Sequence, residues 1–175
     1  TLQCTIANVK PTVLIGTSGQ KAAFDERAIR TMAEHVERPV VFPLSNPISR
    51  AEAHPADVLE WTAGKAIVGT GSPFGIAGVT QVNNVYVFPG IGLGALASGA
   101  TTVSDGMFMA AARRLGELHE GDEGLLPPVT ALREVALEIA VAVVEQAVAE
   151  GLATAEPEAL TRESIAASMW KAEYA

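Results

Sequence analysis

The sequence predicts an α/β fold in which a mostly parallel sheet comes first and helices follow. Short apolar runs alternate with helix-like segments in the first half of the chain, whereas the second half is dominated by helix-like segments. Hydrophobic residues make up 49% of the chain and aromatic residues only 5%, and the abundant Ala, Val, Leu and Gly suit close packing of helices on a sheet. From the length of 175 residues, we expect residues 1–175 to form a single domain.

The first two strands are expected at residues 13–16 (VLIG) and 40–43 (VVFP), which are short apolar runs. Between them, the Asp25 carboxylate can accept hydrogen bonds from a first helical turn, and Phe24 and Ile29 stand at the positions of a hydrophobic staple. This helix should stop before the proline that precedes the second strand. Because one crossover helix separates the strands, we expect them to be parallel neighbours.

Two further strands are expected at residues 66–69 (AIVG) and 85–88 (VYVF). Ahead of them, Ser49 and Glu52 match the S-x-x-E pattern of a capping box, which predicts the start of a short helix. Pro55 suits the first position of another helix, because its missing N–H costs nothing there. The first half of the chain therefore reads β-α-β-α-β-β.

Helices should fill the rest of the chain. Ser104 or Asp105 is expected to cap one helix and Thr161 the last one. The longest helix is expected from about Thr130 to Gly151. Its apolar stripe consists of Leu132, Val135, Ala136, Ile139, Val143 and Ala147.

Charge and composition exclude several classes of protein. The net charge is −8 and Lys and Arg do not cluster, which disfavours binding to nucleic acid or to an anionic membrane. The sequence shows neither a signal peptide nor an apolar run long enough for a membrane span. Cys4 is the single cysteine, so no intrachain disulfide can form, and we expect a structural or incidental role for it. A cytoplasmic location fits these features.

A glycine-rich segment at residues 90–95 (GIGLGA) fits the dinucleotide fingerprint G-x-G-x-x-A, follows an expected strand and leads into a helix. However, no acidic residue ends a following strand about 20 residues later, and Asp105 comes too early for that role. We therefore favour close packing of a glycine-rich helix over a pyrophosphate site.

Small and polar residues follow the expected strands. The loops at Gly16–Gly19 and Gly69–Gly71 come directly after two of them, and ligands bind at the carboxyl ends of parallel strands. Asn46, Asn83 and Asn84 lie near the ends or starts of other strands, and an amide can orient a carboxylate or a nicotinamide without carrying charge. Simple turn formation is the alternative for each of these residues.

Groups that could transfer protons or bind metal are scarce. The segment HEGDEG offers metal ligands on paper, but we expect a solvated acidic loop there. Its candidate ligands are His119, Glu120, Asp122 and Glu123. No Ser-His-Asp arrangement or pair of carboxylates stands out, so the chain looks incomplete as a hydride-transfer catalyst.

Five stretches in order resemble the malic enzymes: KPTVLIGTSGQ, ERPVVFPLSNPISRAE, GTGSPF, NNVYVFPGIGLGALASGA and SDGMFMAAARRL. The resemblance is to the C-terminal part of the NAD(P)-binding domain. It implies a partial Rossmann-like, doubly wound, mostly parallel sheet followed by a helical C-terminal tail. The opening TLQCTIAN matches the family poorly, so we expect the first strand to lack its usual preceding helix.

The resemblance implies oxidative decarboxylation of malate to pyruvate and CO₂ with NAD or NADP and a divalent metal, Mg or Mn. The substrate-binding asparagines would be Asn46 and one of the pair Asn83 and Asn84, of which we favour Asn84. The implied cofactor-binding residues are Gly16, Ser18, Gly19, Asn46, Gly69, Gly71 and Ser72.

The same resemblance places the proton-handling tyrosine and lysine, the acidic metal ligands and the true G-x-G-x-x-G/A ahead of the region equivalent to Thr1. We therefore expect no catalytic residue and no metal ligand in this chain, and little activity from it alone. The family also implies a homo-oligomer. The alternative is a non-catalytic α/β module for association or regulation, which is motivated by the absence of ionisable catalytic groups and by the long apolar helix from Thr130.

Overall fold

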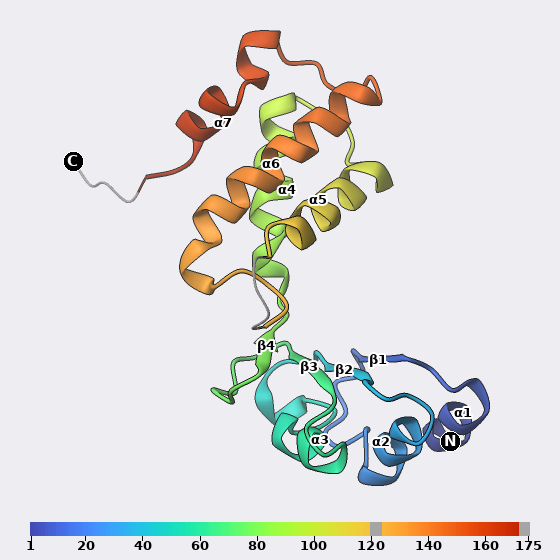
Figure 1. The fold of residues 1–175 in the computed structure, drawn as a ribbon. Coiled ribbons are helices and arrows are strands. Elements are labelled where there is room, and N and C mark those ends of the chain that lie inside the picture. The colour runs from blue at the N-terminus through green and yellow to red at the C-terminus, as the bar shows by residue number, and fades with distance from the viewer. Residues whose placement is uncertain (120–123, 172–175) are drawn as a thin grey trace. The chain divides into compact units, whose positions relative to one another are not determined.

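The computed structural model describes residues 1–119 and 124–171 (Figure 1). These residues divide into two compact units, each with its own core. The first unit contains residues 1–83 with Gly124 and Leu125, and the second contains residues 84–119 and 126–171. The sequence predicts a single domain over this range. Because each of the two units is compact by itself, each is described separately.

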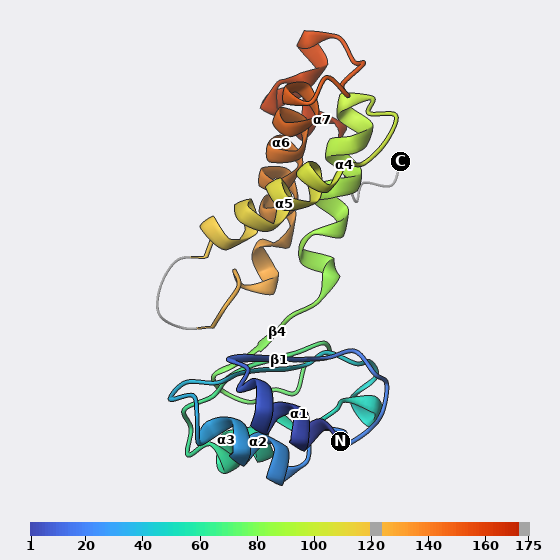
Figure 2. The same ribbon diagram turned by 90° about the vertical axis from the view of Figure 1, so that its right-hand side faces the viewer.

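The first unit is a four-stranded parallel sheet with the order β1-β2-β3-β4. Its helices lie on one face of the sheet (Figures 1 and 2). The elements are α1 (Leu2–Val9), β1 (Val13–Gly16), α2 (Glu26–Ala33), β2 (Val40–Pro43), η1 (Ile48–Arg50), α3 (Pro55–Trp61), β3 (Ile67–Thr70) and β4 (Val79–Gln81). The predicted α/β class and the parallel pairing of the first two strands are confirmed.

The register of the strands aligns one row of apolar side chains under the helices. Leu14 pairs with Val41, Val41 with Val68, and Val68 with Val79. Val41 and Val68 are buried, and the row packs with Ile29 and Met32 of α2 in the core of the unit. Burial of this row fixes which residues of each strand face away from the helices.

The predicted start of α2 is confirmed. The Asp25 carboxylate accepts from Ala28 N at 2.8 Å, and Phe24 and Ile29 are both buried in the same core. The helix ends at Ala33, a few residues before Pro39. Pro55 is confirmed at the first position of α3, where the side chain of His54 supplies the cap by accepting from Ala56 N.

Three local predictions for the first unit are wrong. A helix, α1, precedes the first strand, and its buried Ile6 joins the core. Ser49 and Glu52 form no capping box: the short 3₁₀ helix η1 has no side-chain cap, and Glu52 is buried instead. The third strand runs from Ile67 to Thr70, one residue later than predicted.

The fourth strand is the largest error of the sequence analysis. Strand β4 is Val79–Gln81, whereas Val85 lies in the 3₁₀ helix η2 (Asn84–Tyr86) and Phe88 begins a helix. Pro89 explains this, since a proline suits the first turn of a helix and cannot donate in a sheet. Tyr86 is buried in the core of the second unit, where its hydroxyl donates to Pro127 O at 2.9 Å.

The described residues of the second unit form helices and connecting loops, without a strand. Its main helices are α4 (Phe88–Ser98), α5 (Asp105–Glu117), α6 (Leu132–Ala149) and α7 (Arg162–Ser168), with short 3₁₀ turns η3 (Val129–Ala131) and η4 (Pro157–Leu160). Ser104 caps α5 and Thr161 caps α7, as predicted. The helical C-terminal tail is thereby confirmed.

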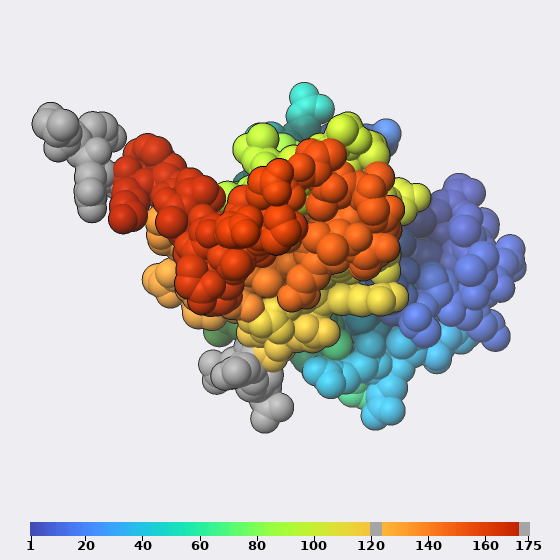
Figure 3. Space-filling model, turned by 90° about the horizontal axis from the view of Figure 1, so that it is seen from above, coloured from blue at the N-terminus to red at the C-terminus, as the bar shows by residue number. Residues whose placement is uncertain are grey.

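Helix α6 is buried on two sides. The predicted stripe, including Val135, Ile139 and Val143, packs in a cluster with α4 and α5. A second row, Leu137 and Val144 among it, packs with Ile165 of α7. Figure 3 shows α6 and α7, in orange and red, beside one another at the surface of this unit. A helix covered on two sides carries more apolar residues than a single amphipathic stripe.

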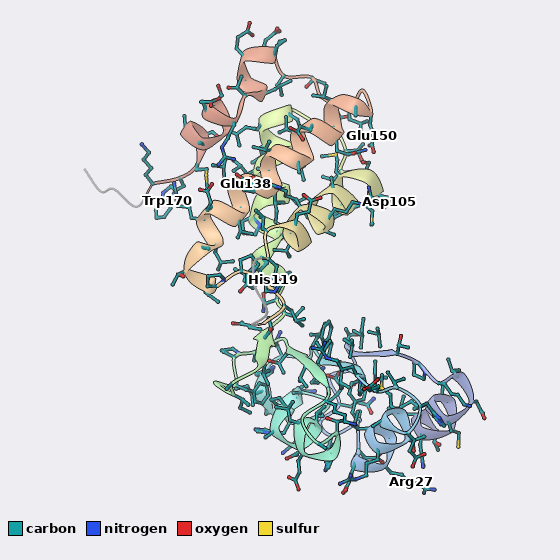
Figure 4. The ribbon with its side chains drawn as sticks, viewed as in Figure 1. Arg27, Asp105, His119, Glu138, Glu150 and Trp170 are labelled. Atoms are coloured by element: carbon teal, nitrogen blue, oxygen red, sulfur yellow. The ribbon has the colours of Figure 1, made fainter. Side chains whose placement is uncertain are left out.

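Ion pairs join three helices of the second unit. The Glu138 carboxylate, on α6 (Figure 4), accepts from Arg114 of α5 and from Arg162 of α7. Arg162 also donates to Glu134 at 2.7 Å. The hydrogen bond from Arg114 lowers the pKa of Glu138, burial opposes this effect, and the bond from Arg162 adds to it.

The glycine-rich segment 90–95 lies inside α4, not in a loop before a helix. A Cβ on Gly90 would stand 2.7 Å from Ile139 Cβ, and one on Gly94 would stand 2.7 Å from Val143 Cβ. The glycines therefore allow α4 to approach α6 closely, which is the packing role favoured from the sequence. No helix in the described part of the chain is long and apolar enough to cross a membrane.

Candidate functional site

Three loops leave the carboxyl ends of β1, β2 and β3, the edge of a parallel sheet at which ligands bind. The first two loops are tied together directly, because Leu44 N donates to Gly16 O at 2.9 Å and Gly19 N donates to Ser45 Oγ at 2.9 Å. Gly19 has a φ of +66°, and a Cβ built on it meets nothing within 4 Å. A side chain at this position would thus extend into open space.

Asn46 joins the second loop to the third. Its Oδ1 accepts a hydrogen bond from Ser72 Oγ, and its side chain is otherwise exposed. The two loops also touch at Gly71, where a Cβ would stand 2.1 Å from Leu44 O and 2.9 Å from Asn46 Nδ2. Only a glycine permits this approach, so Gly71 has a packing reason to be glycine.

Asn83 belongs to the same cluster. Its Nδ2 donates to Gly71 O at 3.0 Å, and Gln81 Nε2 donates to the same oxygen at 3.4 Å. Asn84 is exposed and begins η2 in the second unit. Of the asparagines singled out from the sequence, the structure therefore brings Asn46 and Asn83 together around Gly71.

Two of the glycines expected to contact cofactor have a packing role as well. A Cβ on Gly16 would stand 2.6 Å from Glu52 Cδ, and one on Gly69 would stand 2.6 Å from Val82 Cγ2. Ser18, by contrast, is exposed near the start of the first loop. The expected cofactor-binding residues thus share one edge of the sheet. Gly16, Gly69 and Gly71 are buried there, whereas Ser18 and Asn46 are exposed.

Glu52 is the residue of this site that the sequence analysis missed. It is 0% exposed, and its carboxylate accepts four hydrogen bonds. Ser18 N and Ser18 Oγ donate to Oε1 at 2.7 and 2.8 Å, Ser45 Oγ donates to Oε1 at 2.5 Å, and Ser45 N donates to Oε2 at 3.3 Å. It stands between two alanines, Ala51 and Ala53, and these small apolar neighbours, both buried in the structure, are a local signal of its burial.

These hydrogen bonds keep the buried carboxyl of Glu52 ionised. Burial raises its pKa, but the hydrogen bonds from Ser45 and Ser18 outweigh burial and lower the pKa to about 2. The donors are two hydroxyls and two backbone amides, so neutral groups stabilise the charge. The loops after β1 and β2 thus meet on a buried anion.

The described residues contain no group of three or more His, Cys, Asp or Glu side chains that could hold a metal ion. His119 follows α5 (Figure 4), while Glu120, Asp122 and Glu123 lie outside the described residues. His54 caps α3 and stacks edge-on against Phe74, with 5.1 Å between the ring centroids. Cys4 is exposed on α1.

A parallel sheet with crossover helices on it, and with small and amide side chains gathered at the carboxyl ends of its strands, has the layout of a dinucleotide-binding domain. The model of the family described as malic enzyme, NAD binding domain, matches residues 1–148. The chain therefore belongs to the NAD-binding domain family of the malic enzymes. Because the match begins at residue 1, it includes the opening segment that we expected to depart from the family.

Relatives and solved structures agree with this family. The chain is 48% identical to the NAD-dependent malic enzyme of Photorhabdus laumondii and 46% identical to that of Proteus mirabilis, over 97% of its own length and 32% of theirs. The malic enzyme of Entamoeba histolytica superposes with a TM-score of 0.77 at 27% identity, covering 95% of this chain and 32% of that one. The malic enzyme of Pyrococcus horikoshii superposes with a TM-score of 0.69 at 30% identity, covering 88% of this chain and 34% of that one.

Proposed function

We propose that this chain is the nicotinamide and malate side of a malic enzyme, which converts malate, with NAD, to pyruvate, CO₂ and NADH. The observation that carries the proposal is the cluster of Asn46, Ser72, Gly71 and Asn83 at the carboxyl ends of the strands, in a chain of this family. The chain spans 32% of the length of its relatives, so the complete reaction belongs to a longer protein.

NAD supplies the hydride acceptor of this reaction when it is bound. Ser18 and Gly19 lie at this edge, and Ser18 is exposed. Their N–H groups and the Ser18 hydroxyl already donate to Glu52 and Ser45, so they offer acceptors to the nicotinamide end of the cofactor. We choose NAD over NADP because the relatives are named NAD-dependent. The remaining cofactor contacts in the proposal come from Gly16, Asn46, Gly69, Gly71 and Ser72.

The asparagines have the role of orienting malate. Asn46 Nδ2 remains available as a donor to a substrate carboxylate while Oδ1 accepts from Ser72, so the amide is held in one orientation. The second substrate amide comes from the pair Asn83 and Asn84. Asn83 is supported by its hydrogen bond in this cluster, and Asn84 by the family pattern.

Metal and proton chemistry do not fit the residues at hand. The described residues form no metal site, so the proposal routes no step through a metal held by this chain. The sheet itself is consistent with a missing partner: Val13 and Ile15 of β1, at the edge of the sheet, are 46% and 57% exposed, although parallel sheets are normally covered on both faces. In the proposal, upstream sequence covers this face of the sheet and completes the site.

The test is product formation by the full-length protein and by the 175-residue chain, with malate, NAD or NADP, and Mg²⁺ or Mn²⁺. We expect pyruvate and NADH from the full-length protein, faster with NAD, and none from the chain alone. Absence of pyruvate from the full-length protein would contradict the proposal and favour the non-catalytic module. Turnover by the chain alone would contradict the division of the site between this chain and the rest of the protein.

The proposal also includes a homo-oligomer and a cytoplasmic location. Sedimentation of the full-length protein tests the homo-oligomer, and fractionation of the cell tests the cytoplasmic location.

A further inference from the structure

Resting on that proposed function, we infer that Glu52 is a positioning residue, which joins the loops after β1 and β2 and so holds the proposed substrate and cofactor contacts in place. It stands outside the residues expected to touch either ligand. Its side chain lies beneath both loops, fully buried, and accepts hydrogen bonds from Ser18 and Ser45.

Glu52 contacts Ser18, a proposed ligand residue, directly, and it contacts Ser45, the residue next to Asn46. Ser45 immediately precedes Asn46, and both its amide and its hydroxyl donate to the carboxylate. The same Ser45 hydroxyl accepts from Gly19 N at 2.9 Å, while Ser18 is held by its own amide and hydroxyl. Together with the bond from Leu44 N to Gly16 O, the carboxylate therefore fixes the separation of the two loops from which Ser18, Gly19 and Asn46 are presented.

The backbone of Glu52 also takes part. Its carbonyl oxygen accepts from Phe24 N at 2.9 Å, and Ala51 O accepts from Ala22 N at 3.3 Å. These bonds connect the segment after η1 to the end of the loop that follows β1. Both ends of this loop are thus bonded to the same short segment, one end through the Glu52 side chain and the other through backbone groups. Displacement of the carboxylate would therefore shift Ser18 and Ser45 together.

A purely structural role would have a different signature. Loss of a buried hydrogen-bonded group lowers the stability of a protein wherever it lies. Loss of a positioning group lowers kcat/KM in the folded protein as well, because small displacements of orienting side chains are costly in rate. The two roles are separated by measuring kinetics and loop protection on variants that remain folded.

The experiment compares Glu52→Gln with wild type in the full-length protein. Glutamine keeps the shape and can still accept at Oε1, but it places an NH₂ group against Ser45 N. We expect kcat/KM for malate to fall about 10- to 100-fold at a temperature where both proteins are folded. Hydrogen–deuterium exchange of peptides covering residues 17–20 and 44–46 should become faster. Glu60→Gln, an exposed glutamate on α3, is the matched control and should change neither quantity.

Ser45→Ala is the second variant, in case Glu52→Gln does not fold. It removes one donor to the carboxylate and the acceptor of Gly19 N, and should cause the same two changes to a smaller degree. Unchanged exchange in both loops overturns the inference, and so does faster exchange with unchanged kcat/KM. If wild type forms no pyruvate, the proposed function fails, and the exchange measurement alone decides whether Glu52 joins the loops.

Discussion

At the scale of single residues, the buried charge of Glu52 makes the stability of the first unit depend on pH. The pKa of this group is about 2 in the folded protein, below the ordinary value of 4.5. The stabilisation is therefore fully present above pH 4.5 and is lost as the pH falls toward 2. Hydrogen bonds from neutral donors, not an ion pair, provide it, so added salt should screen it little.

This pH dependence is a prediction of its own. Between pH 7 and pH 2.5 the free energy of unfolding of wild type should fall by about 2.5 kcal/mol more than that of Glu52→Gln, which cannot titrate. Urea unfolding at several pH values measures the difference. Because other carboxyl groups titrate in both proteins, the comparison isolates Glu52. Parallel pH profiles for wild type and Glu52→Gln would show that the carboxylate is not stabilised as described.

The burial and the partners of Glu52 could not be predicted from the local sequence. Its pattern with Ser49 predicted a local capping box, whereas its actual partners include Ser18, which lies 34 positions away. Long-range partners decide the state of a buried ionisable group, and a local motif carries no information about them. Asn46 was singled out because a known family motif surrounds it, not because of its chemistry alone, and its contact with substrate stays a prediction.

At the scale of elements, the contact of α4 with α6 depends on glycine. Gly94→Ala should destabilise the second unit by about 1–3 kcal/mol, because the new Cβ would lie 2.7 Å from Val143 Cβ and 2.8 Å from Ala140 O. Gly92 lies in the same helix with nothing within 4 Å of its Cβ position, so Gly92→Ala should stabilise by up to about 1 kcal/mol. Denaturant unfolding of both variants checks the prediction, and effects of equal sign would contradict it.

The elements that the sequence predicted well are those with strong local signals. Asp25, Ser104 and Thr161 are capping residues in the structure, and the runs at 13–16 and 40–43 are strands. The segment 85–88 has the composition of a strand but leads into α4, since Pro89 and the burial of Tyr86 outweigh local β propensity. Strand β4 was hidden because it is three residues long and none of its residues is fully buried.

At the scale of the whole molecule, the chain looks like one part of a larger catalytic protein. Its sheet has an exposed apolar edge strand, its ligand-side loops are formed, and its described residues hold no metal site. Family membership rests on a match over residues 1–148, and the relatives are about three times as long, since the chain covers 32% of them. In the proposed function this chain positions malate and nicotinamide, whereas the rest of the protein transfers protons and binds metal.

The central claim is that Asn46 positions malate beside the nicotinamide. Steady-state kinetics of the full-length protein with Asn46→Ala test it directly, with Asn83→Ala and Asn84→Ala to identify the second amide. Asn8→Ala, an exposed asparagine in α1, is the control. Loss of a hydrogen bond to a charged carboxylate predicts a fall in kcat/KM for malate of about 10- to 100-fold for Asn46→Ala and no change for Asn8→Ala. Malate kinetics of Asn46→Ala equal to those of wild type would contradict the account.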